Sequence, residues 1–179
     1  MKEDIQEILI SEEAVISRVK ELGQQISKDY EGKELLVVGV LKGSVVFAAE
    51  LLKNITTQCE LDFMAVSSYG NSTESSGVVK ILKDLDNDIK GKHILLVEDI
   101  VDSGVTLNYL QKYLKERNAE SIEIVTLLNK PARRKVDIDV KYQGFEVPDE
   151  FIVGYGIDYA EKYRNLPYIG ILKRSVYEK

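Results

Sequence analysis

Apolar and polar positions follow different patterns in different parts of the chain. From Val15 to Ile26, after Ser11, apolar residues recur every three or four positions, which predicts an amphipathic helix with a capped start. Three apolar runs predict buried strands, namely 35–40, 93–97 and 122–128. The first is rich in β-branched residues and does not alternate, which is typical of a parallel sheet covered on both faces.

Further elements are expected between and after these strands. The pattern predicts helices at 45–53 and 105–117, and shorter or less buried strands at 61–66, 78–82, 152–154 and 169–172. Strand and helix alternate, so the sequence predicts an α/β domain with a mostly parallel sheet. Ligands of such sheets bind beyond the carboxyl ends of the strands. Three loops are therefore of interest, those after Val40, Val97 and Leu128.

Composition narrows the classes of protein that need to be considered. The 179 residues suit a single domain, 1–179, and their formal net charge of -6 disfavours nucleic acid as a partner. No apolar run approaches the roughly 20 residues of a membrane span. A single cysteine, Cys59, excludes an internal disulfide, and a single histidine excludes the usual zinc sites. We expect a cytoplasmic protein with no membrane partner, which holds any anion by local groups.

The most informative stretch runs from residue 97 to residue 106. A buried strand is expected to end in Glu98 and Asp99, and a short loop then opens a helix. Free N–H groups and the dipole at a helix N-terminus favour an anion such as phosphate. Gly104 allows the backbone to approach closely, and Ser103 and Thr106 add hydroxyl donors.

The two adjacent carboxylates have a different use, because like charges repel phosphate. They suit the hydroxyl donors of a sugar, or a hydrated Mg²⁺ ion. One segment thus offers acceptors for hydroxyls and donors for phosphate, which predicts a sugar phosphate as ligand. The alternative is an ordinary turn in which Asp102 or Ser103 merely caps the helix.

The stretch from Val97 to Leu107 resembles the signature of the phosphoribosyltransferases that bind phosphoribosyl diphosphate. The resemblance to their hypoxanthine-guanine branch extends over about 34–172. It implies the type I phosphoribosyltransferase fold, with a central mostly parallel sheet flanked by helices. A small hood would be formed by the N- and C-terminal segments, the latter at about 145–179. The implied reaction transfers a 5-phosphoribosyl group from phosphoribosyl diphosphate to hypoxanthine or guanine, with Mg²⁺ as cofactor.

The resemblance also assigns roles within the signature. Asp102 would be the general base that accepts a proton from purine N7, and Glu98 and Asp99 would hold the ribose hydroxyls and Mg²⁺. The 5-phosphate would lie on the amides of Asp102, Ser103, Gly104, Val105 and Thr106. Val105 is a departure, because some family members have lysine at that position.

Two loops on the diphosphate side also match the family. Leu41, Lys42 and Gly43 would bind diphosphate, with a non-proline cis peptide between the first two. Ser68 and Tyr69 would close over the reaction centre as part of a flexible lid at about 68–78. Without the resemblance, these segments would read as a plain turn and a solvent-exposed loop.

A last set lies near the C-terminus. Lys130 would donate to the 6-oxo group of the base, Phe151 would stack on its ring, and Ile152 would offer backbone hydrogen bonds. Asp158 would act through Mg²⁺, and Arg164 would bind diphosphate. Taken singly, Phe151 suits a core and Arg164 a surface. Ile152 is a variant that leaves the choice among hypoxanthine, guanine and xanthine open.

Two other functions remain as alternatives. A regulatory protein that keeps this fold can bind RNA, but the net charge and the base-pocket residues disfavour it. A phosphoacceptor signalling domain also has an acidic strand end, but it needs that pair near the start of the chain. Family members are usually dimers or tetramers, and we expect a homodimer or homotetramer here.

Overall fold

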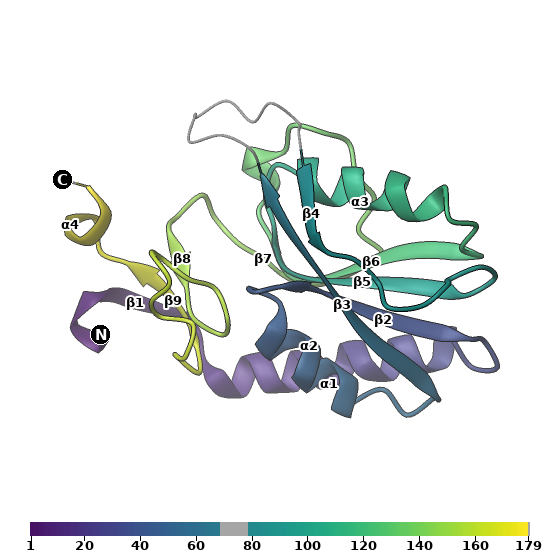
Figure 1. Ribbon diagram of the computed structural model, residues 1–179. Coiled ribbons are helices and arrows are strands. Elements are labelled where there is room, and N and C mark those ends of the chain that lie inside the picture. The colour runs from purple at the N-terminus through teal and green to yellow at the C-terminus, as the bar shows by residue number, and fades with distance from the viewer. Residues whose placement is uncertain (69–78, 179) are drawn as a thin grey trace.

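The computed structural model describes residues 1–68 and 79–178, which form a large and a small sheet (Figure 1). The large sheet has six strands in the order β4-β3-β2-β5-β6-β7. They are β2 (Leu35–Leu41), β3 (Cys59–Ser68), β4 (Val79–Lys83), β5 (His93–Val101), β6 (Ser121–Asn129) and β7 (Tyr142–Glu146). All neighbours pair in parallel except β3 and β4, which are antiparallel. The predicted mostly parallel sheet is confirmed.

Helices cover both faces of this sheet. Helices α1 (Glu12–Asp29) and α2 (Val45–Lys53) pack on one face, and α3 (Val105–Lys115) packs on the other. Successive β2 residues point to opposite cores, Val37 to the first and Val38 to the second. Each face of β2 is buried, which is why its sequence is apolar without alternation. The predicted cap is also present, since Ser11 Oγ accepts a hydrogen bond from Ala14 N at 3.2 Å.

The small sheet forms the predicted hood from the two ends of the chain. Its order is β1-β9-β8, with both pairings antiparallel. These strands are β1 (Ile5–Ile10), β9 (Ile169–Leu172) and β8 (Ile152–Val153). Short helices flank it, η1 (Lys2–Asp4) and α4 (Arg174–Tyr177), and a third, η2 (Pro131–Arg133), follows β6. No helix in the described ranges combines the length and apolarity needed to span a membrane.

The structure corrects the predicted end of the central strand. β5 does not stop before Glu98 but continues to Val101, so both carboxylates lie within the strand. The cause is its neighbour β6, whose equally long ladder pairs Ile100 with Leu128 and Val101 with Asn129. Helix α3 ends at Lys115, earlier than predicted.

Candidate active site

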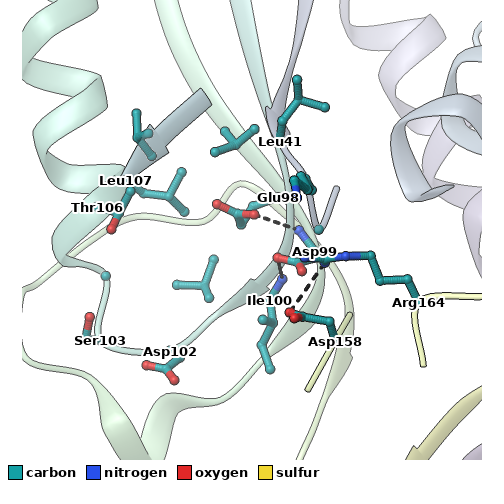
Figure 2. A pocket seen from close by; sticks show the side chains of 16 residues that line it. Leu41, Glu98, Asp99, Ile100, Asp102, Ser103, Thr106, Leu107, Asp158 and Arg164 are labelled. Atoms are coloured by element: carbon teal, nitrogen blue, oxygen red, sulfur yellow. Dashed lines mark hydrogen bonds and ion pairs between the residues drawn. The ribbon is translucent and has the colours of Figure 1, made fainter. Parts of the chain in front are cut away.

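The carboxyl ends of β2 and β5 border a cavity of about 380 Å³ (Figure 2). The N-terminal turn of α3 and the segment 158–164 complete its wall. Its lining contains most of the predicted sugar and diphosphate residues: Leu41, Lys42, Gly43, Glu98, Asp99, Asp102, Ser103, Gly104, Thr106, Asp158 and Arg164. The structure therefore brings together residues that are more than 120 positions apart in the sequence, such as Leu41 and Arg164.

The loop after β2 reaches directly into this cavity. The peptide bond between Leu41 and Lys42 is cis, as the family resemblance implied. A Cβ atom on Gly43 would lie 2.0 Å from Asp99 Oδ2, and one on Gly156 would lie 2.4 Å from Gly43 O. Only glycine therefore allows the loop to pass so close to the carboxylate of β5 and to the 154–157 turn.

The two carboxyl groups of β5 are partly buried beside each other. Glu98 Oε1 accepts a hydrogen bond from Asp99 N at 3.1 Å, and Asp99 Oδ1 accepts one from Ile100 N at 2.7 Å. Burial raises the pKa of Glu98 well above its ordinary value, and the charge of Asp99 raises it further. Burial also raises the pKa of Asp99, although hydrogen bonds oppose this rise. Such a pair is suited to a cation or to hydroxyl donors.

The start of α3 provides the opposite kind of group. Gly104 is its N-cap, with a left-handed φ of 82°. Ser103 Oγ accepts from Val105 N at 3.3 Å, while Ser103 O accepts from Lys135 N at 2.9 Å. The loop is thus held from outside by the 130–136 segment. Free N–H groups at the start of a helix favour an anion, and Gly104 and Thr106 of this turn line the cavity.

Two basic residues face the same cavity and share an acidic neighbour. Arg164 Nη1 donates to Gly156 O at 2.8 Å and lies 3.4 Å from Asp158 Oδ1. Glu161 joins the two cations, at 3.1 Å from Lys42 Nζ and 3.3 Å from Arg164 Nη2. A carboxylate therefore lies between the side chains that were predicted to bind diphosphate. Sequence reasoning missed Glu161, which has no motif of its own.

A second cavity of about 400 Å³ adjoins the first and contains the residues predicted for the base. Lys130, Phe151 and Ile152 line it, and Ile100 and Asp102 line both cavities. Lys130 is only 7% exposed, and its Nζ donates to Glu150 O at 2.8 Å. Burial lowers the pKa of Lys130, and the nearby charge of Asp102 partly offsets this.

The remaining predicted residues differ in how far the structure describes them. Val105 begins α3 but does not line either cavity. The backbone of Ser68 ends β3, while its side chain, Tyr69 and the rest of the predicted lid to residue 78 lie outside the described residues. No cluster of three or more metal-ligating side chains is found in the described part of the chain. A metal held here would need ligands from its substrate as well as from the protein.

Comparison with known proteins agrees with this geometry. The sequence model of a protein family, the phosphoribosyl transferase domain, matches residues 6–160 of this chain. The chain is 59% identical to a hypoxanthine-guanine phosphoribosyltransferase of Bacillus subtilis, over 99% of each chain. A crystal structure of a hypoxanthine phosphoribosyltransferase from Staphylococcus aureus superposes with a TM-score of 0.98. That protein is 53% identical, and the match covers 100% of this chain and 97% of that one. The chain therefore belongs to the hypoxanthine-guanine phosphoribosyltransferase family.

Proposed function

We propose that the chain transfers the 5-phosphoribosyl group of phosphoribosyl diphosphate to a 6-oxopurine, hypoxanthine or guanine, and releases diphosphate. The reaction serves purine salvage. The observation that carries this proposal is the position of Asp102, which lines both cavities. One cavity has donors for phosphate beside acceptors for hydroxyls, and the other has a buried lysine and an aromatic ring. The bond between sugar and base would form where the two cavities meet.

The first cavity suits phosphoribosyl diphosphate. The amides from Asp102 to Thr106 receive the 5-phosphate at the N-terminus of α3. Lys42 and Arg164 supply positive charge for the diphosphate, and the backbone N–H of Gly43 lies in the same wall. The diphosphate would replace Glu161 as the partner of both cations. Glu98 and Asp99 accept hydrogen bonds from the ribose hydroxyls.

Magnesium fits the acidic side of this cavity. Glu98 and Asp99 form a partly buried pair whose pKa values are raised chiefly by burial, so a bound cation would stabilise their ionised form. Two carboxylates are a common protein contribution to Mg²⁺, with substrate oxygens and water as the other ligands. Asp158 lies 3.4 Å from Arg164, the residue expected to bind diphosphate, so it would act on a magnesium ion that is bound to the diphosphate. When bound, Mg²⁺ would neutralise the negative charge of the departing diphosphate.

The second cavity suits a purine with an oxygen at C6. Lys130 donates to that oxygen, and its cation disfavours the amino group of adenine at the same place. The Phe151 ring stacks on the base, and the backbone of Ile152 hydrogen-bonds to its pyrimidine edge. Base stacking on an aromatic side chain contributes about 1–3 kcal/mol and tolerates either base.

Catalysis then depends on position and charge. The base N9 attacks C1′ of the ribose, and the bond from C1′ to the diphosphate oxygen breaks. Positive charge develops on the sugar ring, which Glu98 and Asp99 stabilise from its hydroxyl side. Asp102 accepts the proton from N7 of the base as N9 forms the new bond. Holding both substrates in line accounts for much of the remaining acceleration.

The direct test is incubation with phosphoribosyl diphosphate, Mg²⁺ and each of hypoxanthine, guanine, xanthine and adenine. Nucleotide formation with hypoxanthine or guanine, absent with adenine and lost on chelation of Mg²⁺, is the expected result. Formation of adenine nucleotide at a similar rate would contradict the role of Lys130. No nucleotide from any base would contradict the enzymatic proposal itself.

Three further properties belong to the same proposal. The chain is expected to act as one domain over 1–179, in the cytoplasm, and as a homodimer or homotetramer. The single cysteine and the acidic net charge are compatible with that compartment. Light scattering on the purified protein measures its mass in solution, and a monomeric mass would contradict the expected dimer or tetramer.

A further inference from the structure

The ring of Phe151 is itself held by two tyrosines. Its centroid lies 4.5 Å from that of Tyr177, with 27° between the ring planes, so that the two rings are stacked. The ring of Tyr159 lies 5.3 Å away at 89°, in an edge-to-face arrangement. Both geometries are the favoured ones for aromatic pairs. The ring expected to stack on the base is therefore part of an aromatic cluster, made of Phe151, Tyr159 and Tyr177.

Tyr177 belongs to α4, the last helix of the chain. Figure 1 shows α4 on the side of the small sheet that faces away from the large sheet. Ile100 of β5 lines the base cavity from the large sheet, opposite the hood. Tyr177 stacks on one face of the Phe151 ring, and Phe151 and Ile100 line the same cavity, so we expect the base to stack on the other face of Phe151, on the side of Ile100.

The position of α4 relative to Phe151 is fixed by backbone contacts. Leu172 N donates to Phe151 O at 2.8 Å at the end of β9. Lys173, the next residue, donates from its N to Asp4 O at 2.9 Å and from its Nζ to Glu3 O at 2.6 Å. The start of α4 is therefore held by hydrogen bonds to the residues that precede β8 and β1. Tyr177, with Arg174 and Glu178, also lines the base cavity.

We propose that Tyr177 is a positioning residue for base binding. By stacking on one face of Phe151, it fixes that ring in the orientation that a purine needs, without touching the sugar or the diphosphate. The inference rests on the proposed function, because it assumes that Phe151 stacks on a base. Its consequence is selective: loss of Tyr177 should weaken ligands that contain a base and spare ligands that lack one.

The test compares two ligands of the full-length protein, inosine monophosphate and ribose 5-phosphate, by isothermal titration calorimetry with Mg²⁺. Tyr177→Ala is expected to raise the dissociation constant of inosine monophosphate about three- to tenfold, which is the range of one aromatic contact. The dissociation constant of ribose 5-phosphate should change by less than about twofold. Tyr177→Phe is expected to bind both like the wild type, since it keeps the ring. In steady state, Tyr177→Ala should raise KM for the base while KM for phosphoribosyl diphosphate stays constant.

A second variant separates positioning from general stability of the hood. Tyr168 packs in the same hood core but does not line the base cavity. Tyr168→Ala should lower Tm yet leave the ratio of the two dissociation constants unchanged. Equal weakening of both ligands by Tyr177→Ala would overturn the proposal, and so would tighter binding of inosine monophosphate, which would mean that Tyr177 occupies the place of the base. A wild type that binds neither ligand would instead contradict the proposed function.

Discussion

Asp102 is one of two residues, with Ile100, that line both described cavities. Both lie in or next to the end of β5, and their side chains meet the sugar side and the base side of the site. A carboxylate at that junction can reach a proton on the base while the sugar is held by its neighbours. Its place between the cavities supports the role of general base that we propose for it.

Replacement of Asp102 tests this role. We expect Asp102→Ala to lower kcat by about 10²–10⁴-fold, because proton transfer from the base loses its acceptor. Thermal unfolding should change little, since Asp102 is only partly buried. Asp139→Ala, an exposed carboxylate on the segment after η2, is the matched control and should keep full activity. A kcat for Asp102→Ala within a few-fold of wild type would remove it from the mechanism.

Lys130 should make base binding sensitive to alkaline pH. Burial lowers its pKa, so the ammonium loses its proton at a lower pH than an exposed lysine would. Above that pKa the 6-oxo group loses a charged donor, and KM for hypoxanthine should rise. Lys130→Arg keeps its charge, so the rise should be smaller in that variant, although the base itself titrates equally in both.

A truncation complements the pH profile. Lys130→Ala should weaken binding of the base more than binding of diphosphate. Lys42→Ala should do the reverse, because the two lysines line different cavities. Parallel losses in the two dissociation constants for both variants would contradict the division of the site.

Most residues that line the two cavities could be predicted from the sequence, because short family motifs mark the loops after β2, β5 and β6 and the segment 151–164. Glu161 and Tyr177 could not. Glu161 acquires its significance only when the 158–164 segment folds back onto Lys42. Tyr177 lies in a four-residue helix whose contact with Phe151 depends on the hood. Neither residue has a local pattern that marks its partner.

At the scale of elements, β5 and the loop after β2 form the frame of the first cavity. Along β5, Leu95 and Val97 pack in one core and Ile94 and Leu96 in the other, but Ile100 packs against the first core and Val101 in the second, so strict alternation is not kept past Glu98. The close pass of Gly43 beside Asp99 joins the two elements. This contact depends on a missing side chain, so a single methyl group is a sensitive probe of it.

Gly43→Ala is expected to disturb phosphoribosyl diphosphate binding specifically. Its Cβ would lie 2.0 Å from Asp99 Oδ2, so either the loop or the carboxylate must move. A displacement of that size should lower kcat/KM for phosphoribosyl diphosphate by about tenfold to a hundredfold. The dissociation constant of a free purine, which would bind in the other cavity, should change little.

Gly32→Ala serves as the control. Its added Cβ meets no atom within 4 Å, although its φ of 75° costs some stability. It should lose stability without losing activity. If Gly43→Ala were fully active, the close approach of loop and strand would have no role in catalysis.

The sequence predicted the apolar elements well, including the short strands β8 and β9, and the more polar strands less well. The buried strands and α2 have apolar patterns that already predict their secondary structure, and tertiary contacts agree with that prediction. β1 and β7 were missed because both contain polar residues at several positions, as in Tyr142–Glu146. Each depends on a partner far away in the chain, β9 for β1 and β6 for β7. The end of β5 was misplaced for the same reason, since β6 extends it.

At the scale of the molecule, Asp84 joins the edge of the large sheet to the end of α3. It follows β4 and accepts hydrogen bonds from Tyr113 Oη and from Arg117 Nη1, the latter at 2.9 Å. Partial burial raises its pKa, but these hydrogen bonds and the charge of Arg117 outweigh it, and the net pKa is lowered. The folded state therefore favours the ionised form.

This pKa shift predicts a loss of stability in acid. Because the folded pKa lies below the unfolded one, the stabilisation is present above about pH 4 and is lost as pH falls through the folded pKa. Urea unfolding at pH 7 should show Asp84→Asn to be about 1 kcal/mol less stable than wild type. The difference should shrink toward pH 3. A difference that stays constant with pH would assign the effect to packing.

The small sheet has a consequence for how the protein is made. β9 lies between β1 and β8, so the first strand of the chain finds its partner only after residue 172 has been synthesised. On the ribosome, the large sheet can begin to form while β1 is still unpaired. In a nascent chain, the turn that we propose to bind phosphate would thus form before the hood that we propose to hold the purine. Translation that stalls shortly before β9 would leave a product that contains Lys130 and Phe151 but lacks the strand that pairs with both β1 and β8.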